Sequence, residues 1–186
     1  MTNRFSHIES GKIPNNWHFG ELGDYVTIET GKRAKGGGLS SGIIPSIGGE
    51  HIDKSGKILW ENLKFIPEHF YNELKQGRIM QNDILVVKDG ATTGKVAFIK
   101  SMPYDRLAVN EHVFIIRTKT TDVLNCFLYY VMASPTVQKQ IKSLFHGMIG
   151  GITREEVSSF VIPIPPLKEQ QKIAEILSTV DEVIEK

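Results

Sequence analysis

The pattern of apolar and polar positions predicts a body built mainly of β-strands. Four segments either alternate apolar and polar side chains or are dense in β-branched residues, the patterns typical of half-buried and fully buried strands. These segments are residues 25–30, 83–88, 95–100 and 112–118. Loops rich in glycine or polar residues join them. The second and third segments flank one such loop, residues 88–95, which we expect to be a strand–loop–strand connection.

Helical spacing replaces the strand pattern later in the chain. Between residues 122 and 134, apolar side chains recur at the spacing of one buried helical face, and Cys126 lies among them. Ser134 and Pro135 are the residue types expected at the N-cap and first position of a second helix. This pair of helices should pack on the sheet. The predicted fold class is therefore α+β, a twisted, β-rich domain with packed helices.

Near residue 153 the sequence predicts the start of a short helix, followed by a last strand and then a C-terminal helix. Thr153 and Glu156 have the spacing of a capping box, which is the ordinary structural reading of both residues. A strand over 160–164 then meets Pro165 and Pro166, which cannot continue a sheet and suit the entry of a helix. We therefore divide the chain into a domain over residues 1–164 and a C-terminal helix over residues 165–186.

The C-terminal helix carries an apolar stripe of the coiled-coil kind. Ile173, Leu177, Val180 and Ile184 recur at intervals of four, three and four residues. A short helix is marginal alone in water, so this stripe should lie against another helix. A neighbour in the same chain is one possibility. We favour a second chain, because the two prolines should project the helix away from the domain.

Composition predicts where in the cell the protein is found and shows a mild difference in charge between the two parts of the chain. Lys and Arg total 22 and Asp and Glu 21, so the whole chain lacks the strong basicity of many nucleic-acid-binding proteins. From Arg154 onward there are four basic and seven acidic residues, which leaves the preceding part mildly basic. The first ten residues lack an apolar signal core, no run is long enough for a membrane helix, and Cys126 has no disulfide partner. We expect a soluble cytoplasmic protein that does not contact a membrane.

The sequence Lys-Asp-Gly-Ala-Thr-Thr-Gly-Lys at 88–95 invites a nucleotide-binding interpretation. A P-loop needs four residues between its glycines and a Ser or Thr after its lysine. Gly90 and Gly94 are separated by three residues, and Lys95 is followed by Val96. A nucleotidyl-lysine site at Lys88 finds no supporting cluster of metal-binding carboxylates. We therefore expect no nucleotide, metal or other cofactor.

Asn110, Glu111 and His112 precede a strand and suggest acid–base chemistry. A histidine beside a carboxylate is more often a structural hydrogen bond, and no serine or cysteine nucleophile has a recognisable setting. We assign no catalytic residue.

Several segments together resemble the specificity subunit of type I restriction-modification enzymes. The residues 162–177, IPIPPLKEQQKIAEIL, resemble the conserved region that closes each half of that subunit, with a strand, a double proline, Leu-x-Glu-Gln and a long helix. Residues 11–33, 74–99 and 147–167 resemble its target recognition domain. The resemblance implies a non-catalytic reader of double-stranded DNA that works with separate modification (methyltransferase) and restriction subunits.

The chain departs from that family in size. Family members usually carry two recognition domains and two helical regions, whereas this sequence has one domain and about half of one helix. It is either a half-sized subunit that forms a homodimer through its C-terminal helix or a fragment of a longer subunit. A fragment of a self-contained DNA methyltransferase and a protein-binding coiled-coil scaffold are the alternative functions.

A DNA reader needs cations for phosphates and short polar side chains for base edges. Lys32, Arg33 and Lys35 lie beside three glycines in a basic loop suited to phosphates, and Thr92 and Thr93 should form the tip of a groove-entering loop between Lys88 and Lys95. The remaining candidates are polar loop residues. They are Ser46, His51, Asn110, His112, His146 and Arg154.

Overall fold

The computed structural model describes residues 14–144 and 151–184. The chain forms nine strands and six α-helices in this described part, with two 3-10 turns. The strands are β1 (His18–Glu21), β2 (Val26–Thr30), β3 (Pro45–Ile47), β4 (Lys64–Phe65), β5 (Ile84–Val87), β6 (Val96–Phe98), β7 (Ala108–Val109), β8 (Val113–Thr118) and β9 (Val161–Ile164). The helices are α1 (Leu22–Tyr25), α2 (Glu68–Glu73), α3 (Asn125–Ala133), α4 (Pro135–Ser143), α5 (Arg154–Ser158) and α6 (Leu167–Ile184), and the 3-10 turns are η2 (Lys35–Gly37) and η3 (Gly49–His51).

The centre of the molecule is an antiparallel four-stranded sheet in the order β2-β8-β5-β6. Its strands are the four that hydrophobic patterning predicts, and β5 pairs with β6 across the loop 88–95 as a strand–loop–strand connection. Every residue of β5 is buried. A strand with an uninterrupted apolar run is expected where both faces of a sheet are covered.

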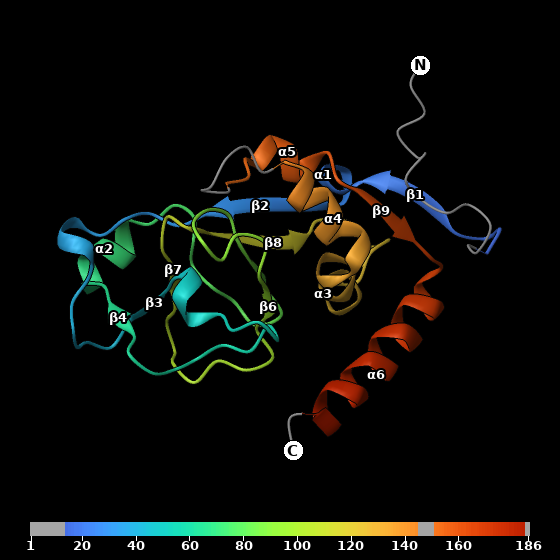
Figure 1. Cartoon of the computed structure of the whole chain (residues 1–186). Coiled ribbons are helices and arrows are strands. Elements are labelled where there is room, and N and C mark those ends of the chain that lie inside the picture. The colour runs from blue at the N-terminus through green and yellow to red at the C-terminus, as the bar shows by residue number, and fades with distance from the viewer. Residues whose placement is uncertain (1–13, 145–150, 185–186) are drawn as a thin grey trace.

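The two faces of this sheet support two separate hydrophobic cores. On one face, alternate residues of β5 and β8 pack against α3 and α4, with Phe127, Leu128 and Met132 among the buried helical residues. On the other face, the intervening residues pack against β3, η3 and the chain around residues 99–109. Figure 1 shows α3 and α4 on one side of this sheet and β3, β4 and β7 on the other. The expected pair of helices on the sheet is confirmed.

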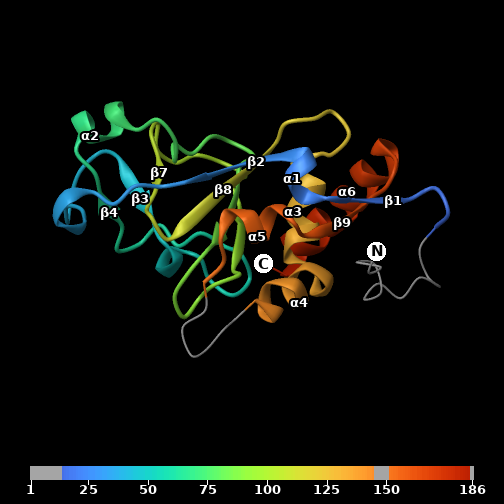
Figure 2. The same cartoon turned by 90° about the horizontal axis from the view of Figure 1, so that it is seen from above.

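Two smaller sheets were not predicted from the sequence. Strands β4, β3 and β7 form one of them, with β3 antiparallel to β4 and parallel to β7. Strands β1 and β9 form the other, which brings the beginning of the described chain beside its C-terminal part. Viewed from above, these two sheets lie at opposite ends of the molecule (Figure 2). Strand β9 confirms the strand predicted over 160–164, whereas β1, β3, β4 and β7 were not predicted.

The predicted helix starts are confirmed by their capping geometry. The Ser134 hydroxyl accepts a hydrogen bond from the Val137 N–H, and Pro135 occupies the first turn of α4. Thr153 and Glu156 form the predicted capping box at the start of α5.

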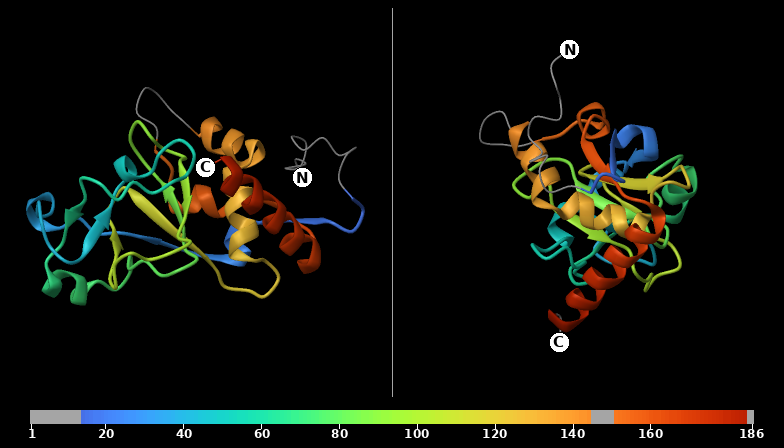
Figure 3. Two further views of the ribbon diagram at one scale, coloured as in Figure 1. Left: turned by 90° about the horizontal axis from the view of Figure 1, so that it is seen from below. Right: turned by 90° about the vertical axis from the view of Figure 1, so that its right-hand side faces the viewer.

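Helix α6 confirms the predicted helix but not its predicted direction. It follows the double proline, yet it runs beside α3 rather than projecting freely from the domain. Ala174 is buried in the first core, Ile173 packs against that core, and the Tyr130 hydroxyl donates to Asp181 Oδ2 at 2.8 Å. Figure 3 shows α6 against α3, with its last turns reaching beyond the other elements. The double proline turns the chain but does not detach the helix.

No helix within the described ranges is both long and apolar enough to span a membrane.

Candidate nucleic-acid interface

A polar cleft of about 320 Å³ lies at the end of the molecule that carries the β4-β3-β7 sheet. Its walls come from the loop after β2, from β3 and η3, from β4 and from the loop before β8. Four predicted DNA-binding residues line it, namely Arg33, Ser46, Asn110 and His112. Glu50, Lys64 and Glu111 add further charges. The fold therefore gathers polar groups that are up to 79 residues apart in sequence, from Arg33 to His112, into one concave surface.

The basic loop is positioned by close backbone contact at Gly31. A Cβ at this position would lie 2.0 Å from the Val109 carbonyl oxygen and 2.3 Å from that of Asn110. Only glycine lets the two backbones approach so closely. Asn110 in turn shapes its own loop, because its Oδ1 accepts a hydrogen bond from the His112 N–H at 2.9 Å. Arg33 is thereby held near Glu111 and His112.

Five charged or titratable side chains form a continuous series across three loops. Lys88 contacts Asp89 at 3.2 Å, and Asp89 contacts His112 through Nδ1. His112 Nε2 lies 3.4 Å from Glu111, which also pairs with Arg33 at 3.5 Å. Bases and acids alternate along this series, so each cation has a carboxylate neighbour. In the described part of the chain, no group of three or more His, Cys, Asp or Glu residues is arranged to hold a metal ion.

The loop 88–95 is held against the domain more firmly than an exposed finger would be. Thr93 is half-buried, and its hydroxyl donates to the Gly90 carbonyl at 2.7 Å. Lys95 Nζ donates to the Ile52 carbonyl at 2.6 Å. Thr92 is also half-buried, and its Oγ1 would lie 2.9 Å from a Cβ at Gly49. Ala91 is exposed, whereas both threonines are half-buried.

His51 has a structural position. It is 4% exposed, its Nδ1 accepts a hydrogen bond from the Gly48 N–H at 2.9 Å, and its Nε2 lies 3.4 Å from the Asn62 carbonyl. These bonds fix the turn η3 below the cleft. Burial with both ring nitrogens facing backbone groups gives His51 no free edge for a base, so we remove it from the candidate contacts.

The remaining candidates are cations outside the cleft. Lys32 and Lys35 are exposed, and Lys32 Nζ lies 6.0 Å from the centre of the Phe70 ring. Arg154 is exposed at the start of α5, just after Ile152, whose N–H donates to the Lys88 carbonyl. This backbone bond places α5 next to the loop 88–95. His146 lies outside the described residues.

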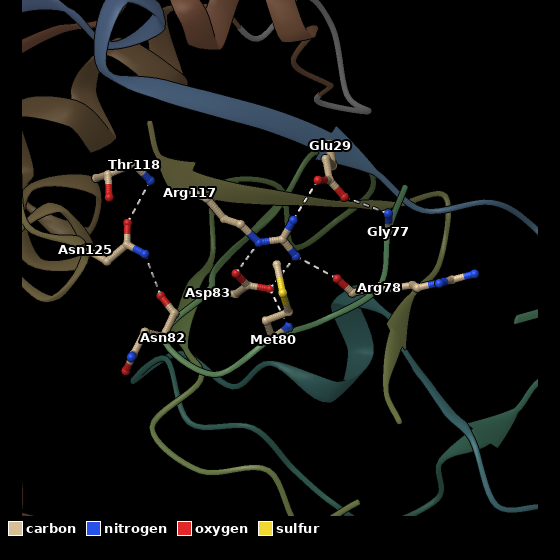
Figure 4. A network of polar contacts seen from close by, with 9 residues as sticks. All are labelled: Glu29, Gly77, Arg78, Met80, Asn82, Asp83, Arg117, Thr118 and Asn125. Carbon is tan, nitrogen blue, oxygen red and sulfur yellow. Dashed lines mark hydrogen bonds and ion pairs between the residues drawn. The ribbon is translucent and has the colours of Figure 1, made fainter. Parts of the chain in front are cut away.

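A buried ionic cluster supports the sheet and was missed in the sequence. Arg117 on β8 donates to both carboxylate oxygens of Asp83, to Glu29 on β2 and to the Arg78 carbonyl (Figure 4). Asp83 is only 1% exposed. Burial alone would lower the pKa of Arg117, but the hydrogen bonds and charges of Asp83 and Glu29 outweigh burial and raise that pKa. Glu29 also accepts a hydrogen bond from the Gly77 N–H, so the cluster holds the chain at Gly77 against β2.

The motif Leu-x-Glu-Gln fastens α6 to the domain. Gln170 is fully buried, donates to the Asp122 and Pro165 carbonyls, and accepts from the Leu124 N–H. Glu169 accepts hydrogen bonds from the Asn16 amide and the Trp17 indole. The motif is visible in the sequence, but the partners of its polar side chains come from segments far away along the chain.

The family model for the type I restriction modification DNA specificity domain matches residues 14–186. The MjaVIII specificity subunit of Methanocaldococcus jannaschii is 28% identical over 190 residues, a match that covers 97% of this chain and 43% of the relative. The EcoKI specificity subunit of Escherichia coli is 26% identical, with coverage of 92% and 38%. The chain therefore spans about two fifths of the length of these relatives.

Solved structures share the fold. The HsdS subunit from Thermoanaerobacter tengcongensis superposes with a TM-score of 0.64 at 16% identity, covering 95% of this chain and 40% of that one. The S subunit of a type I restriction-modification system from M. genitalium gives a TM-score of 0.65 at 19% identity, with coverage of 94% and 42%. Because the family model covers nearly the whole sequence, the chain belongs to the family of type I restriction-modification DNA specificity domains, which are non-catalytic recognition modules.

Proposed function

We propose that this chain recognises a specific double-stranded DNA sequence through the surface formed by the polar cleft and the basic loop 32–38. The observation that carries the proposal is the convergence of Arg33, Ser46, Asn110 and His112 on one cleft. Arg33, Asn110 and His112 present hydrogen-bond donors and acceptors of the kinds that distinguish base edges, whereas Ser46, at 9% exposure, forms part of the cleft wall.

Separate groups on this surface would supply affinity and sequence discrimination. Lys32 and Lys35 are exposed beside the cleft and suit phosphate contacts, which provide salt-dependent affinity without sequence information. Lys88 and Arg154 would add phosphate contacts at the neighbouring loop 88–95 and at the start of α5. Thr92, Thr93 and Lys95 have backbone or packing contacts within the domain, so we assign them to positioning the loop rather than to base contact.

Helix α6 would join the recognition domain to the rest of the assembly. Its last three turns carry an exposed apolar stripe, with Ile176 at 55%, Val180 at 47% and Val183 at 68% exposure, beside Leu177 and Ile184. Such a stripe is stable in water when it packs against another helix. Pairing with a second copy, or with an equivalent helix of a longer subunit, would place two recognition domains at opposite ends and specify a DNA site in two separated parts.

The proposed partners follow from this arrangement. Two recognition domains on one DNA site would direct separate methyltransferase and restriction subunits to that site. A cytoplasmic location stays a prediction, supported by the single cysteine at position 126.

Selection from random-sequence duplexes tests the proposal. The whole chain is incubated with a pool of double-stranded oligonucleotides, and bound molecules are recovered and sequenced over several rounds. We expect enrichment of one sequence pattern at physiological salt. Binding without enrichment would contradict sequence recognition, and failure to bind any duplex at low salt would favour the protein-binding alternative.

A further inference from the structure

We propose that Arg33 and Glu111 form a single reading unit for one G·C base pair in the major groove. The inference rests on the proposed function and assigns a specificity-determining role to a carboxylate inside the DNA-facing cleft. It concerns the pair at the centre of the cleft wall, where Glu111 lies 3.5 Å from Arg33 and 3.4 Å from His112.

The position of Glu111 needs an explanation in a surface that meets DNA. A carboxylate repels phosphates and partly neutralises the cation beside it, so it weakens binding to every duplex regardless of sequence. Its ion pair with Arg33 contributes little to folding, because the Arg33 side chain is 74% exposed. A carboxylate in this place is useful if it accepts a hydrogen bond from a base.

The chemistry of the pair matches one base-pair edge. In the major groove, guanine presents two acceptors, N7 and O6, and its cytosine partner presents the N4 amino donor next to them. An arginine fork supplies two donors, and a carboxylate beside it supplies an acceptor. The ion pair engages Nε of Arg33, so it does not require the two terminal amino groups that a bidentate contact with guanine would use.

The surrounding residues hold the acceptor, the Glu111 carboxylate, more firmly than the donor, the Arg33 guanidinium. The Glu111 side chain is only 29% exposed, and His112 on its other side is itself held by Asp89. Gly31 keeps the backbone of the basic loop against Val109 and Asn110, so Arg33 starts from a defined place although its side chain is mobile enough to reach a base. Preorganisation of this kind lowers the entropic cost of forming the contact.

The test uses the duplex selected by the wild-type chain. Every G·C pair in that duplex is replaced in turn by A·T, and the affinity of the wild-type chain, Glu111→Gln and Arg33→Lys is measured for each. We expect the wild-type chain to lose roughly 5- to 150-fold at one G·C pair, and both variants to show a smaller preference for G·C at the same pair while keeping preferences elsewhere. Glu111→Gln removes the negative charge of the side chain and keeps its shape. Arg33→Lys keeps the positive charge but removes the paired guanidinium donors.

A matched control separates this effect from a general change of charge. Glu73→Gln removes an exposed carboxylate on α2 that does not line the cleft, so its electrostatic change equals that of Glu111→Gln. Both variants should bind random duplex slightly more tightly, which also shows that they are folded. If Glu111→Gln keeps every base preference, as Glu73→Gln should, the inference is wrong while sequence recognition stands. If the wild-type chain enriches no sequence, the proposed function itself fails, and the inference with it.

Discussion

At the scale of single residues, the structure separates side chains that face the cleft from those that hold its walls. Arg33, Asn110 and His112 line the cleft, whereas His51 and Lys95 are bonded to backbone carbonyls or amides within the domain. All five are polar residues in predicted loops or at the ends of predicted strands. Residue types marked all five as candidates for polar contacts. They could not distinguish these two groups, because that depends on which backbone groups need partners once the chain is folded.

Lys32 and Lys35 should determine affinity rather than base preference. Replacing both by alanine removes two proposed phosphate contacts, and each contact contributes about 0.9 to the slope of log affinity against log salt concentration. We expect the slope for random duplex to become shallower by about 1.8. Fluorescence anisotropy titrations at several salt concentrations measure it. Lys168→Ala with Lys172→Ala, two exposed lysines on α6, removes the same charge and should leave the slope unchanged.

At the scale of elements, sequence patterns predicted the central sheet, strand β9 and helices α3 to α6, but not α1, α2 or the pairing of the small sheets. The four central strands carry apolar runs or alternate apolar and polar residues, and α6 contains no glycine or proline. Strand β1 is recognisable only through its partner β9, since its four residues show no buried position. The direction of α6 was also predicted incorrectly. The double proline marks where the helix begins, while the buried side chain of Gln170 determines where it lies.

Gln170 should be the strongest single anchor of α6. Replacing it by leucine removes its bonds to the part-buried Leu124 N–H and Asp122 carbonyl and to the buried Pro165 carbonyl, and an unsatisfied buried group costs about 1–3 kcal/mol. We expect the free energy of unfolding to fall by about 3 kcal/mol in urea titrations. The neighbouring variant Gln171→Leu, at an exposed position, should change it by less than about 0.5 kcal/mol. Equal effects of the two variants would refute the anchoring role.

The exposed stripe on α6 should mediate helix pairing. Leu177→Asp combined with Val180→Asp places two charges in the apolar stripe, where burial of an unpaired charge is costly. We expect the double variant to be monomeric in sedimentation velocity under conditions in which the unchanged chain is dimeric. Gln171→Asp with Thr179→Asp adds the same charges at exposed polar positions of the helix and should leave association intact. A dimer that survives the first pair of substitutions contradicts pairing through this stripe.

At the scale of the whole molecule, the recognition surface and the exposed end of α6 are carried by one continuous body. The cleft includes Ala34 and Ile66 of a third, smaller core cluster in its wall, and α6 packs on the first core at one face of the central sheet. Because the sheet and the Arg117 cluster join the two faces, a helix partner held by α6 would occupy a fixed position relative to the DNA surface. The length of α6 between its buried anchor Gln170 and the exposed stripe that begins at Ile176 should therefore influence the distance between two recognition domains.

Inserting seven helical residues between Glu175 and Ile176, ahead of the exposed apolar stripe, should lengthen the spacer of the two-part DNA site. Seven residues add about 10 Å of helix, which corresponds to about 3 base pairs of duplex. Sequencing of the sites methylated by the assembled complex measures the spacer. A spacer that stays the same length after the insertion would show that α6 does not determine it.

The most direct test of the central claim is the affinity of the whole chain for its selected duplex compared with a shuffled duplex of identical base composition, at one physiological salt concentration. We predict tighter binding to the selected duplex by at least about tenfold, a conservative bound for specific recognition. That preference should disappear when Arg33, Asn110 and His112 are replaced together by alanine. Equal affinity of the unchanged chain for both duplexes would contradict the account.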